Sequence, residues 1–149
     1  MRASVLSALV AVAFGAAACS EGTTEQAPAP ADAPPAAVLG GVDLNQPLRA
    51  LGTEPFWGLD VSSEGLSWTG VDETPLTAPN PGPGLAGTTA NWRTRTADGQ
   101  TLVLTLIATE CSDGMSDRVY PLTAKVELGE REMIGCAASQ AFLATAPAP

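Results

Sequence analysis

The chain has 149 residues, with 16 acidic and seven basic side chains, no histidine and a formal net charge of −9 at pH 7. This charge excludes a nucleic-acid partner, because phosphate contacts need a basic stripe and the few Arg residues are scattered. An acidic surface keeps a protein soluble and attracts basic partners. The lack of histidine removes the commonest general base and transition-metal ligand, and Lys125 is the only lysine that could assist a nucleophile. We therefore predict a protein that is not an enzyme and that holds no cofactor or metal.

Residues 1–18 have the layout of a signal peptide. A basic start precedes an apolar run over residues 5–14, too short to span a bilayer comfortably, and Ala16-Ala17-Ala18-Cys19 follows. The small residues suit ordinary signal peptidase. Small residues directly before a cysteine also resemble the lipobox of bacterial lipoproteins, with Ala16 in the place usual for Leu. Lipidation accounts for the cysteine count, because three cysteines in an exported protein leave one over and Cys19 stands outside the predicted domain.

Cys19 is therefore the predicted lipid anchor, which tethers the protein to a membrane without a spanning helix. The resemblance to Gram-negative lipoproteins implies the outer membrane, because Ser20 rather than Asp follows the cysteine, and the domain then faces the periplasm. Residues 19–38 are a Pro- and Ala-rich linker that cannot bury a core and favours an extended spacer. Residues 40–143 are the predicted β domain, and residues 144–149 are a disordered tail of similar composition to the linker.

No segment between residues 40 and 138 sustains a helical period, and short apolar or alternating runs are separated by turn residues. The clearest half-buried strand covers residues 120–128, and residues 101–108, apolar on both faces, mark a central strand. Residues 72–86 carry four prolines and are predicted to be a long surface loop. Residues 139–145 fit either a helical turn or a closing strand. Further strands are predicted over residues 48–51, 56–62, 66–71, 88–96 and 133–138. The fold class is all-β, a small antiparallel β-barrel or sandwich of about seven to eight strands with one disulfide.

The disulfide is predicted between Cys111 and Cys136. These cysteines flank a hairpin that turns near Gly129, so antiparallel pairing brings Cys136 back toward the strand that ends at Cys111. Export makes oxidation favourable. A metal pair is the alternative, but two thiols without histidine or further cysteines fall short of a zinc ligand set.

Two stretches carry extended motifs, and a Gly135-Cys136 pair follows them. They read Gly52-Thr53-Glu54-Pro55-Phe56-Trp57 and Cys111-Ser112-Asp113-Gly114-Met115-Ser116-Asp117-Arg118-Val119-Tyr120-Pro121. They resemble the G-x-E-P-F-W and C-x-D-G-M-S-D-x-x-Y-P motifs of an uncharacterised family of small bacterial envelope lipoproteins. The resemblance spans most of the predicted domain and implies location and fold more than activity. It extends to the envelope inhibitors of C-type lysozyme, small β-barrel lipoproteins that reach the lysozyme cleft with a Ser and a Lys on particular loops. No motif aligns Ser116 and Lys125 with that pair.

Each motif has a structural and a binding interpretation. Pro55 can fix the entry to a strand while the aromatic side chains fill the core, or Trp57 and Glu54 can form a rim patch for a ligand, since Trp is enriched in binding hot spots. The segment 113–117 can be turn chemistry; calcium binding with Glu110 is a weaker alternative, because the spacing differs from D-x-[DN]-x-[DN]-G. A catalytic carboxylate pair is weaker still, because nothing indicates a substrate cleft. The candidate binding residues are Glu54, Phe56, Trp57, Asp113, Met115, Ser116, Asp117 and Tyr120.

These features together predict an outer-membrane-anchored periplasmic lipoprotein whose domain is a non-enzymatic binding module. The predicted partner is a basic protein, such as lysozyme, or a cell-wall component. The alternative is a barrel that holds a small molecule or a cell-wall fragment in an apolar cavity.

Overall fold

The structure is a computed structural model that describes residues 37–145. The predicted signal peptide, the lipidated Cys19, nearly all of the linker and residues 146–149 lie outside the described residues. Within residues 37–145, no helix combines the length and the apolar character needed to cross a membrane.

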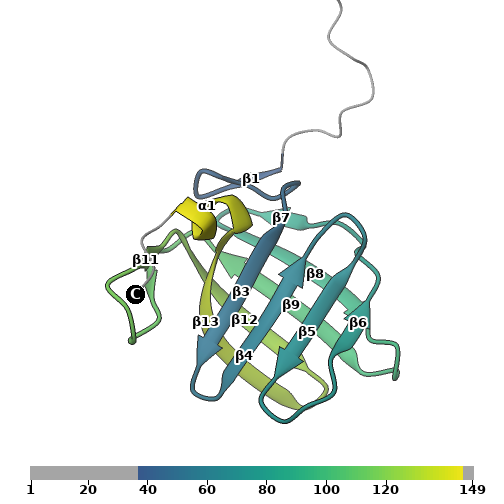
Figure 1. Cartoon of the computed structure of the whole chain (residues 1–149). Helices are drawn as coiled ribbons and strands as arrows, with labels where there is room; N and C mark the ends of the chain where they lie inside the picture. The colour runs from purple at the N-terminus through teal and green to yellow at the C-terminus, as the bar shows by residue number, and fades with distance from the viewer. Residues whose placement is uncertain (1–36, 146–149) are drawn as a thin grey trace, which may run out of the picture. The chain divides into compact units, whose positions relative to one another are not determined.

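Nine antiparallel strands form one sheet, in the order β6-β5-β4-β3-β13-β12-β9-β8-β7. Their bounds are β3 (Leu48–Thr53), β4 (Phe56–Val61), β5 (Leu66–Gly70), β6 (Leu76–Ala78), β7 (Gly84–Ala86), β8 (Thr89–Arg95), β9 (Thr101–Ile107), β12 (Leu122–Leu128) and β13 (Arg131–Ser139). Two short hairpins pair β1 (Val38–Leu39) with β2 (Val42–Asp43) and β10 (Cys111–Ser112) with β11 (Val119–Tyr120). A single helical turn and a half, α1 (Gln140–Thr145), follows β13 (Figure 1).

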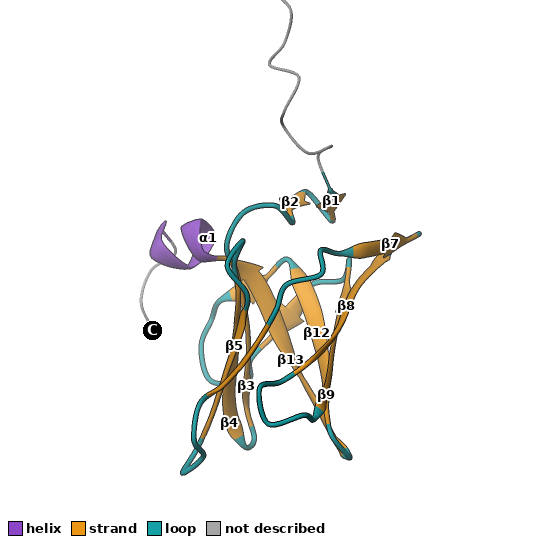
Figure 2. Ribbon diagram, turned by 90° about the vertical axis from the view of Figure 1, so that its right-hand side faces the viewer, coloured by secondary structure: helices purple, strands orange, loops and turns teal. Residues whose placement is uncertain are grey.

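The sheet curls into a half-barrel, so that β3, β4 and β5 face β8, β9 and β12 (Figure 2). Its open side is partly closed by hydrogen bonds that join β6 and the residue after it to the end of β8 and the segment that follows. The backbone N–H of Ala97 donates to the carbonyl of Thr77 at 2.9 Å, and the Thr94 hydroxyl donates to the carbonyl of Pro79 at 2.9 Å. The predicted all-β class and antiparallel architecture are confirmed.

The concave face of the sheet forms the main core, because alternate residues of every long strand point inward. Its largest fully buried side chains are Leu48, Leu59, Leu66, Trp68, Trp92, Leu102, Leu104, Leu106, Leu122, Val126 and Leu128. Strand β9 is paired on both sides, with β8 and β12, as its two apolar faces predict.

One end of the core is held by Glu73, in the connection after β5. Its carboxylate accepts a hydrogen bond from Trp68 Nε1 at 3.1 Å and forms an ion pair with Arg131 of β13. The Arg131 guanidinium also lies 5.9 Å from the centroid of the Trp68 ring. Hydrogen bonds from Arg131 and then Trp68 lower the pKa of Glu73.

The predicted loop over residues 72–86 is wrong in part, because it contains the edge strands β6 and β7. Each has only three paired residues, and the prolines fall just outside them, so no ladder donor is lost. These two strands raise the main sheet to nine strands. The predicted strand over residues 120–128 is broken at Pro121, and residues 140–145 take the helical alternative.

Candidate functional site

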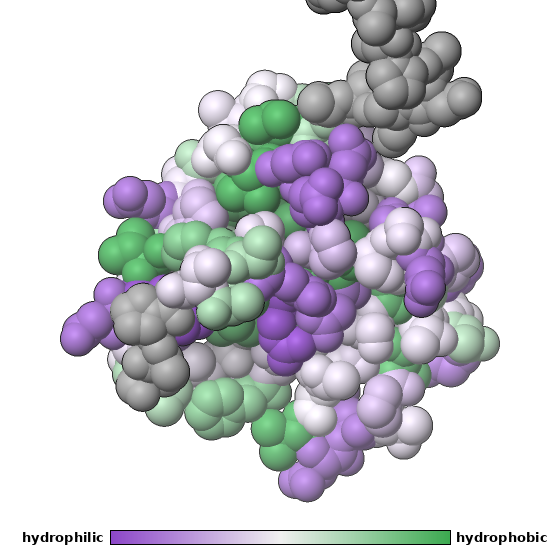
Figure 3. Space-filling model, turned by 45° about the horizontal axis from the view of Figure 1, so that its top comes forward, coloured by the Kyte–Doolittle hydropathy of each residue, from purple (hydrophilic) through white to green (hydrophobic). Residues whose placement is uncertain are grey.

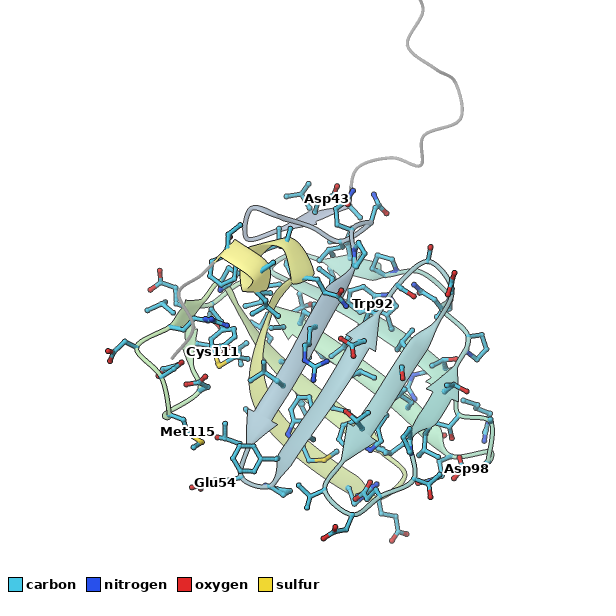
Figure 4. All side chains as sticks on the ribbon, viewed as in Figure 1. Asp43, Glu54, Trp92, Asp98, Cys111 and Met115 are labelled. Carbon is cyan, nitrogen blue, oxygen red and sulfur yellow. A yellow bond between two sulfur atoms is a disulfide. The ribbon has the colours of Figure 1, made fainter. Side chains whose placement is uncertain are left out.

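The two motifs meet on the convex, outer side of the sheet. Thr53, at the end of β3, donates its hydroxyl hydrogen to the carbonyl oxygen of Asp113 at 3.0 Å. Asp113 belongs to the cysteine loop, residues 111–120, which runs from β10 to β11. Figure 4 places Glu54 and Met115, one from each motif, close together at the same corner of the molecule.

Asp113 organises the cysteine loop. Its Oδ1 accepts the backbone N–H groups of Met115 and Ser116 at 3.0 and 2.9 Å. Its Oδ2 accepts the hydroxyls of Ser116 and Tyr120, both at 2.9 Å. Burial raises the pKa of Asp113, but the donors from Met115, Ser116 and Tyr120 outweigh burial and lower the pKa to about 2. The carboxylate therefore acts as a charged acceptor that folds the loop around itself.

The predicted disulfide between Cys111 and Cys136 is confirmed, with the two Cα atoms 5.4 Å apart. It fastens the cysteine loop to the outer side of β13, where Cys136 lies opposite Thr123 of β12 and Leu51 of β3. A second, smaller core forms there beneath the loop and α1. Its members are Tyr120, Cys136 and Ala138, with Leu51, Cys111, Phe142 and Leu143 packed against them.

Phe56 and Trp57 point to opposite faces of β4. Trp57 is only 6% exposed and stacks on Trp68 in the main core, with ring centroids 5.5 Å apart. Its indole also covers Gly52 and Gly135 of the adjacent strands: a Cβ at Gly52 would lie 2.2 Å from Trp57 Nε1, and one at Gly135 would lie 2.9 Å from the same ring. Trp57 is therefore a core residue, and of the two aromatic side chains only Phe56 faces solvent.

Two hollows flank the end of β3 on the outer face. The first, the β4 hollow, measures about 380 Å³ and lies over Gly58, which lacks a side chain between Leu51 and Thr69. The second, the loop hollow, measures about 360 Å³ and lies between the cysteine loop and the sheet. Leu51, Gly52 and Thr53 line both hollows. We call the pair, with this shared stretch of β3, the two-hollow surface.

Exposed apolar side chains are concentrated at this surface. Phe56 (55% exposed) and Val71 (56%) line the β4 hollow, while Met115 (66%) and Ile134 (69%) line the loop hollow. They are four of the seven large apolar side chains that are exposed within residues 37–145. Figure 3, drawn from another side, shows such hydrophobic patches as isolated areas between hydrophilic ones. The sequence interpretation missed Val71 and Ile134. The available signal for Ile134 was its place on the opposite face of β13 from Met133 and Ala137.

The charges at the two-hollow surface are mostly acidic. Arg49 lines the β4 hollow, but its guanidinium is paired with Asp60, at 2.7 and 3.0 Å from the two carboxylate oxygens. Glu54 and Asp113 line the loop hollow. Glu54 is exposed, and so is Asp117 further along the cysteine loop.

The polar side chains of the cysteine loop are hydrogen-bonded to one another. With a pKa of about 2, Asp113 is a weak base at neutral pH, and Ser116 donates to that same carboxylate. Within residues 37–145, no three Asp, Glu or Cys side chains come together as metal ligands. The Asp113 oxygens that the calcium alternative would need already accept hydrogen bonds from within the cysteine loop. Lys125 lies within β12 rather than on a loop, with its ammonium 3.3 Å from Glu127 and 2.9 Å from Glu132.

Of the eight candidate binding residues, three line the loop hollow and two are buried. Glu54, Asp113 and Met115 line that hollow, and Phe56 lines the β4 hollow. Trp57 and Tyr120 are buried in the two cores, although Trp57 is also among the residues that line the β4 hollow. Ser116 is part of the Asp113 network, and Asp117 is exposed on the loop.

Comparison with protein-family models, with curated proteins and with solved structures finds no match to this chain. The resemblance to envelope lipoproteins therefore rests on the two motifs, and it stays a prediction.

Proposed function

We propose that this chain is a lipoprotein of the cell envelope, anchored in the outer membrane through Cys19 and facing the periplasm, whose β domain is a non-enzymatic binding module. The observation that carries the proposal is the concentration of exposed apolar side chains around two adjoining hollows. Contiguous apolar patches rimmed by polar residues mark interaction sites on soluble domains. The signal-peptide layout and Cys19 supply the export and the anchor.

Binding at this surface is tested by cross-linking the tagged, full-length protein in the intact envelope. A Phe56→Ala/Ile134→Ala variant removes one apolar side chain from each hollow. Leu85→Ala is the matched control, because Leu85 is an exposed apolar residue (49%) on β7. We expect wild type and control to capture the same partners and the double variant to lose them. If all three proteins captured the same partners, the two-hollow surface would not be the binding site.

The anchor has its own test. The mass of the mature protein should include acyl chains on Cys19, and a Cys19→Ser variant should leave the membrane fraction. An unmodified Cys19 in the wild-type protein would overturn the lipoprotein assignment while leaving the binding surface unaffected.

A specific form of the proposal is inhibition of a basic lysozyme, for which the acidic domain would speed encounter. The measurement is lysozyme activity with increasing amounts of this protein at low and at high salt. Inhibition that weakens with salt supports this form, and no inhibition at either salt concentration removes it.

The alternative function is a carrier for a small molecule inside the half-barrel. One observation favours it: the indole Nε1 of Trp92, buried in the main core, donates to no acceptor within the described chain. A buried donor normally has a partner, and a polar ligand atom could supply one. Native mass spectrometry of the purified protein should then show a retained ligand, and its absence favours the binding module.

A further inference from the structure

The two-hollow surface has two apolar subsites separated by a ridge. The ridge consists of the outward side chains Leu51 and Thr53 of β3, and Thr53 is fixed there by its bond to the cysteine loop. Each hollow lies at the small end of the range for ligand pockets, so each suits one side chain rather than a whole cofactor. Because the hollows lie on either side of one strand, their centres are about two strand spacings, or ~10 Å, apart. A protein segment that presents two apolar side chains matches this arrangement.

The charge of the molecule restricts which kind of partner can bind at this surface. With a formal charge of −9, a second copy of the chain would be repelled, and so would an anionic lipid surface. At the surface itself the Arg49 charge is paired with Asp60. The other charged groups that line the hollows are the carboxylates of Glu54 and Asp113. Glu54 is exposed beside the loop hollow, where it can meet a basic side chain of a partner.

We propose that the two-hollow surface binds an extended, cationic protein segment, with one apolar side chain in each hollow and a basic side chain against Glu54. This inference rests on the proposed binding function and names the chemistry of its partner. Apolar contacts supply most of the affinity, and the acidic surroundings set the choice between basic and acidic segments.

The test uses the mature full chain with Cys19→Ser, so that no detergent is needed, and three synthetic peptides as probes. The first alternates Arg and Leu, the second alternates Glu and Leu, and the third alternates Arg and Gly. Binding is followed by NMR through the methyl signals of Met115 and Ile134. We expect the Arg–Leu peptide to shift these signals and to bind at least tenfold more tightly than either other peptide. Equal binding of the Arg–Leu and Glu–Leu peptides would overturn the cationic assignment.

Substitutions locate the contact. Phe56→Ala/Ile134→Ala should weaken binding of the Arg–Leu peptide at least tenfold, and Leu85→Ala should leave it unchanged. Glu54→Gln should weaken binding two- to fivefold at ~20 mM salt and have no effect at ~500 mM, where surface charges are screened. All of these side chains are exposed, so the fold, checked by near-UV circular dichroism, should persist. Unchanged binding in the double variant would place the peptide elsewhere and overturn the inference.

Failure of this inference and failure of the proposed function can be told apart. If the envelope partner depends on Phe56 and Ile134 but is acidic, neutral or a glycan, the binding function stands and the cationic segment is wrong. If no partner depends on these residues, both are wrong.

Discussion

Gly52 and Gly135 show how single residues position the site. The Trp57 indole lies across both glycines, and a Cβ at Gly135 would also come within 2.0 Å of the backbone oxygen of Leu51. Two adjacent strands can therefore pair closely beneath a large aromatic ring only because neither position carries a side chain. The first motif thus serves the core through Gly52 and Trp57, and it serves the surface through Glu54 and Phe56.

Gly135→Ala should consequently destabilise the domain by about 3 kcal/mol, because a backbone atom has to move. Gly84→Ala is the control. Its nearest contact is a 3.3 Å approach to the side-chain oxygen of Asn91 on an exposed edge, and its cost should stay within about 1 kcal/mol. Denaturant unfolding of both variants measures the difference, and equal stability would contradict this account of Trp57 packing.

Asp113→Asn tests the charged centre of the cysteine loop. The folded-state pKa of about 2 lies below the ordinary value of 3.8, so ionised Asp113 stabilises the fold above pH ~4. That contribution is lost as the pH falls toward 2. At pH 7 the variant should lose about 1–2 kcal/mol, allowing for solvent screening, and the gap to wild type should narrow by pH 3.

Asp117→Asn is the matched control for Asp113→Asn, because Asp117 is an exposed carboxylate of the same loop. Its unfolding free energy should stay within ~0.5 kcal/mol of wild type at both pH values. If the two variants behaved alike, the hydrogen bonds to Asp113 would not be what holds the loop.

The cysteine loop, as an element, is attached to the sheet rather than part of it. Its attachments are the disulfide, the Thr53–Asp113 bond and the small core around Tyr120, whereas the nine-stranded sheet has its own core. The loop hollow exists only while these attachments keep the loop above Leu51 and Ile134.

Reduction of the disulfide should therefore loosen this element without unfolding the sheet. The bond links positions 25 residues apart, for which the chain-entropy estimate is about 3 kcal/mol. Hydrogen exchange should show lost protection over residues 111–120 and α1, with β9 and β12 still protected. A Cys111→Ser/Cys136→Ser variant is the control, since a reductant should not change it further. Complete unfolding of the reduced wild type at pH 7 would contradict this separation.

Strands with clear alternation of apolar and polar residues were predictable from the sequence. Short strands that form only because a neighbouring strand pairs with them were not. Residues 122–128 alternate apolar and polar side chains, and they form a strand. Strands β6 and β7 were missed because three-residue edges need only one partner and tolerate neighbouring prolines. For the site, the motifs identified most of the loop hollow. Trp57 faces inward with Leu59 and Val61, as period-two alternation indicates, whereas the approach of Ile134 to the cysteine loop depends on cross-strand register.

At the scale of the whole molecule, the curl of the sheet separates two roles. The concave face gathers the large apolar side chains into one core, and the convex face carries the cysteine loop, the Arg49–Asp60 ion pair and the two hollows. Residues of the two-hollow surface can therefore be substituted without loss of the main core. This is why the exposed variants Phe56→Ala and Ile134→Ala can report on binding alone.

The stability of the whole domain should be nearly independent of pH from about 5.5 to 9. The chain has no histidine, and Cys111 and Cys136 are joined in a disulfide, so no side chain of residues 37–145 has an ordinary pKa within that interval. Folding lowers the pKa of Glu73, Asp98 and Asp113. The stabilisation that these ionised groups contribute is therefore lost only as the pH falls below ~4. Folding raises the pKa of Tyr120 by burial and of Lys125 through Glu132 and Glu127, so their contributions are lost only as the pH rises above ~10. Urea unfolding from about pH 2 to about pH 11 should give a plateau with two falling limbs, and a step near pH 6–7 would contradict this expectation.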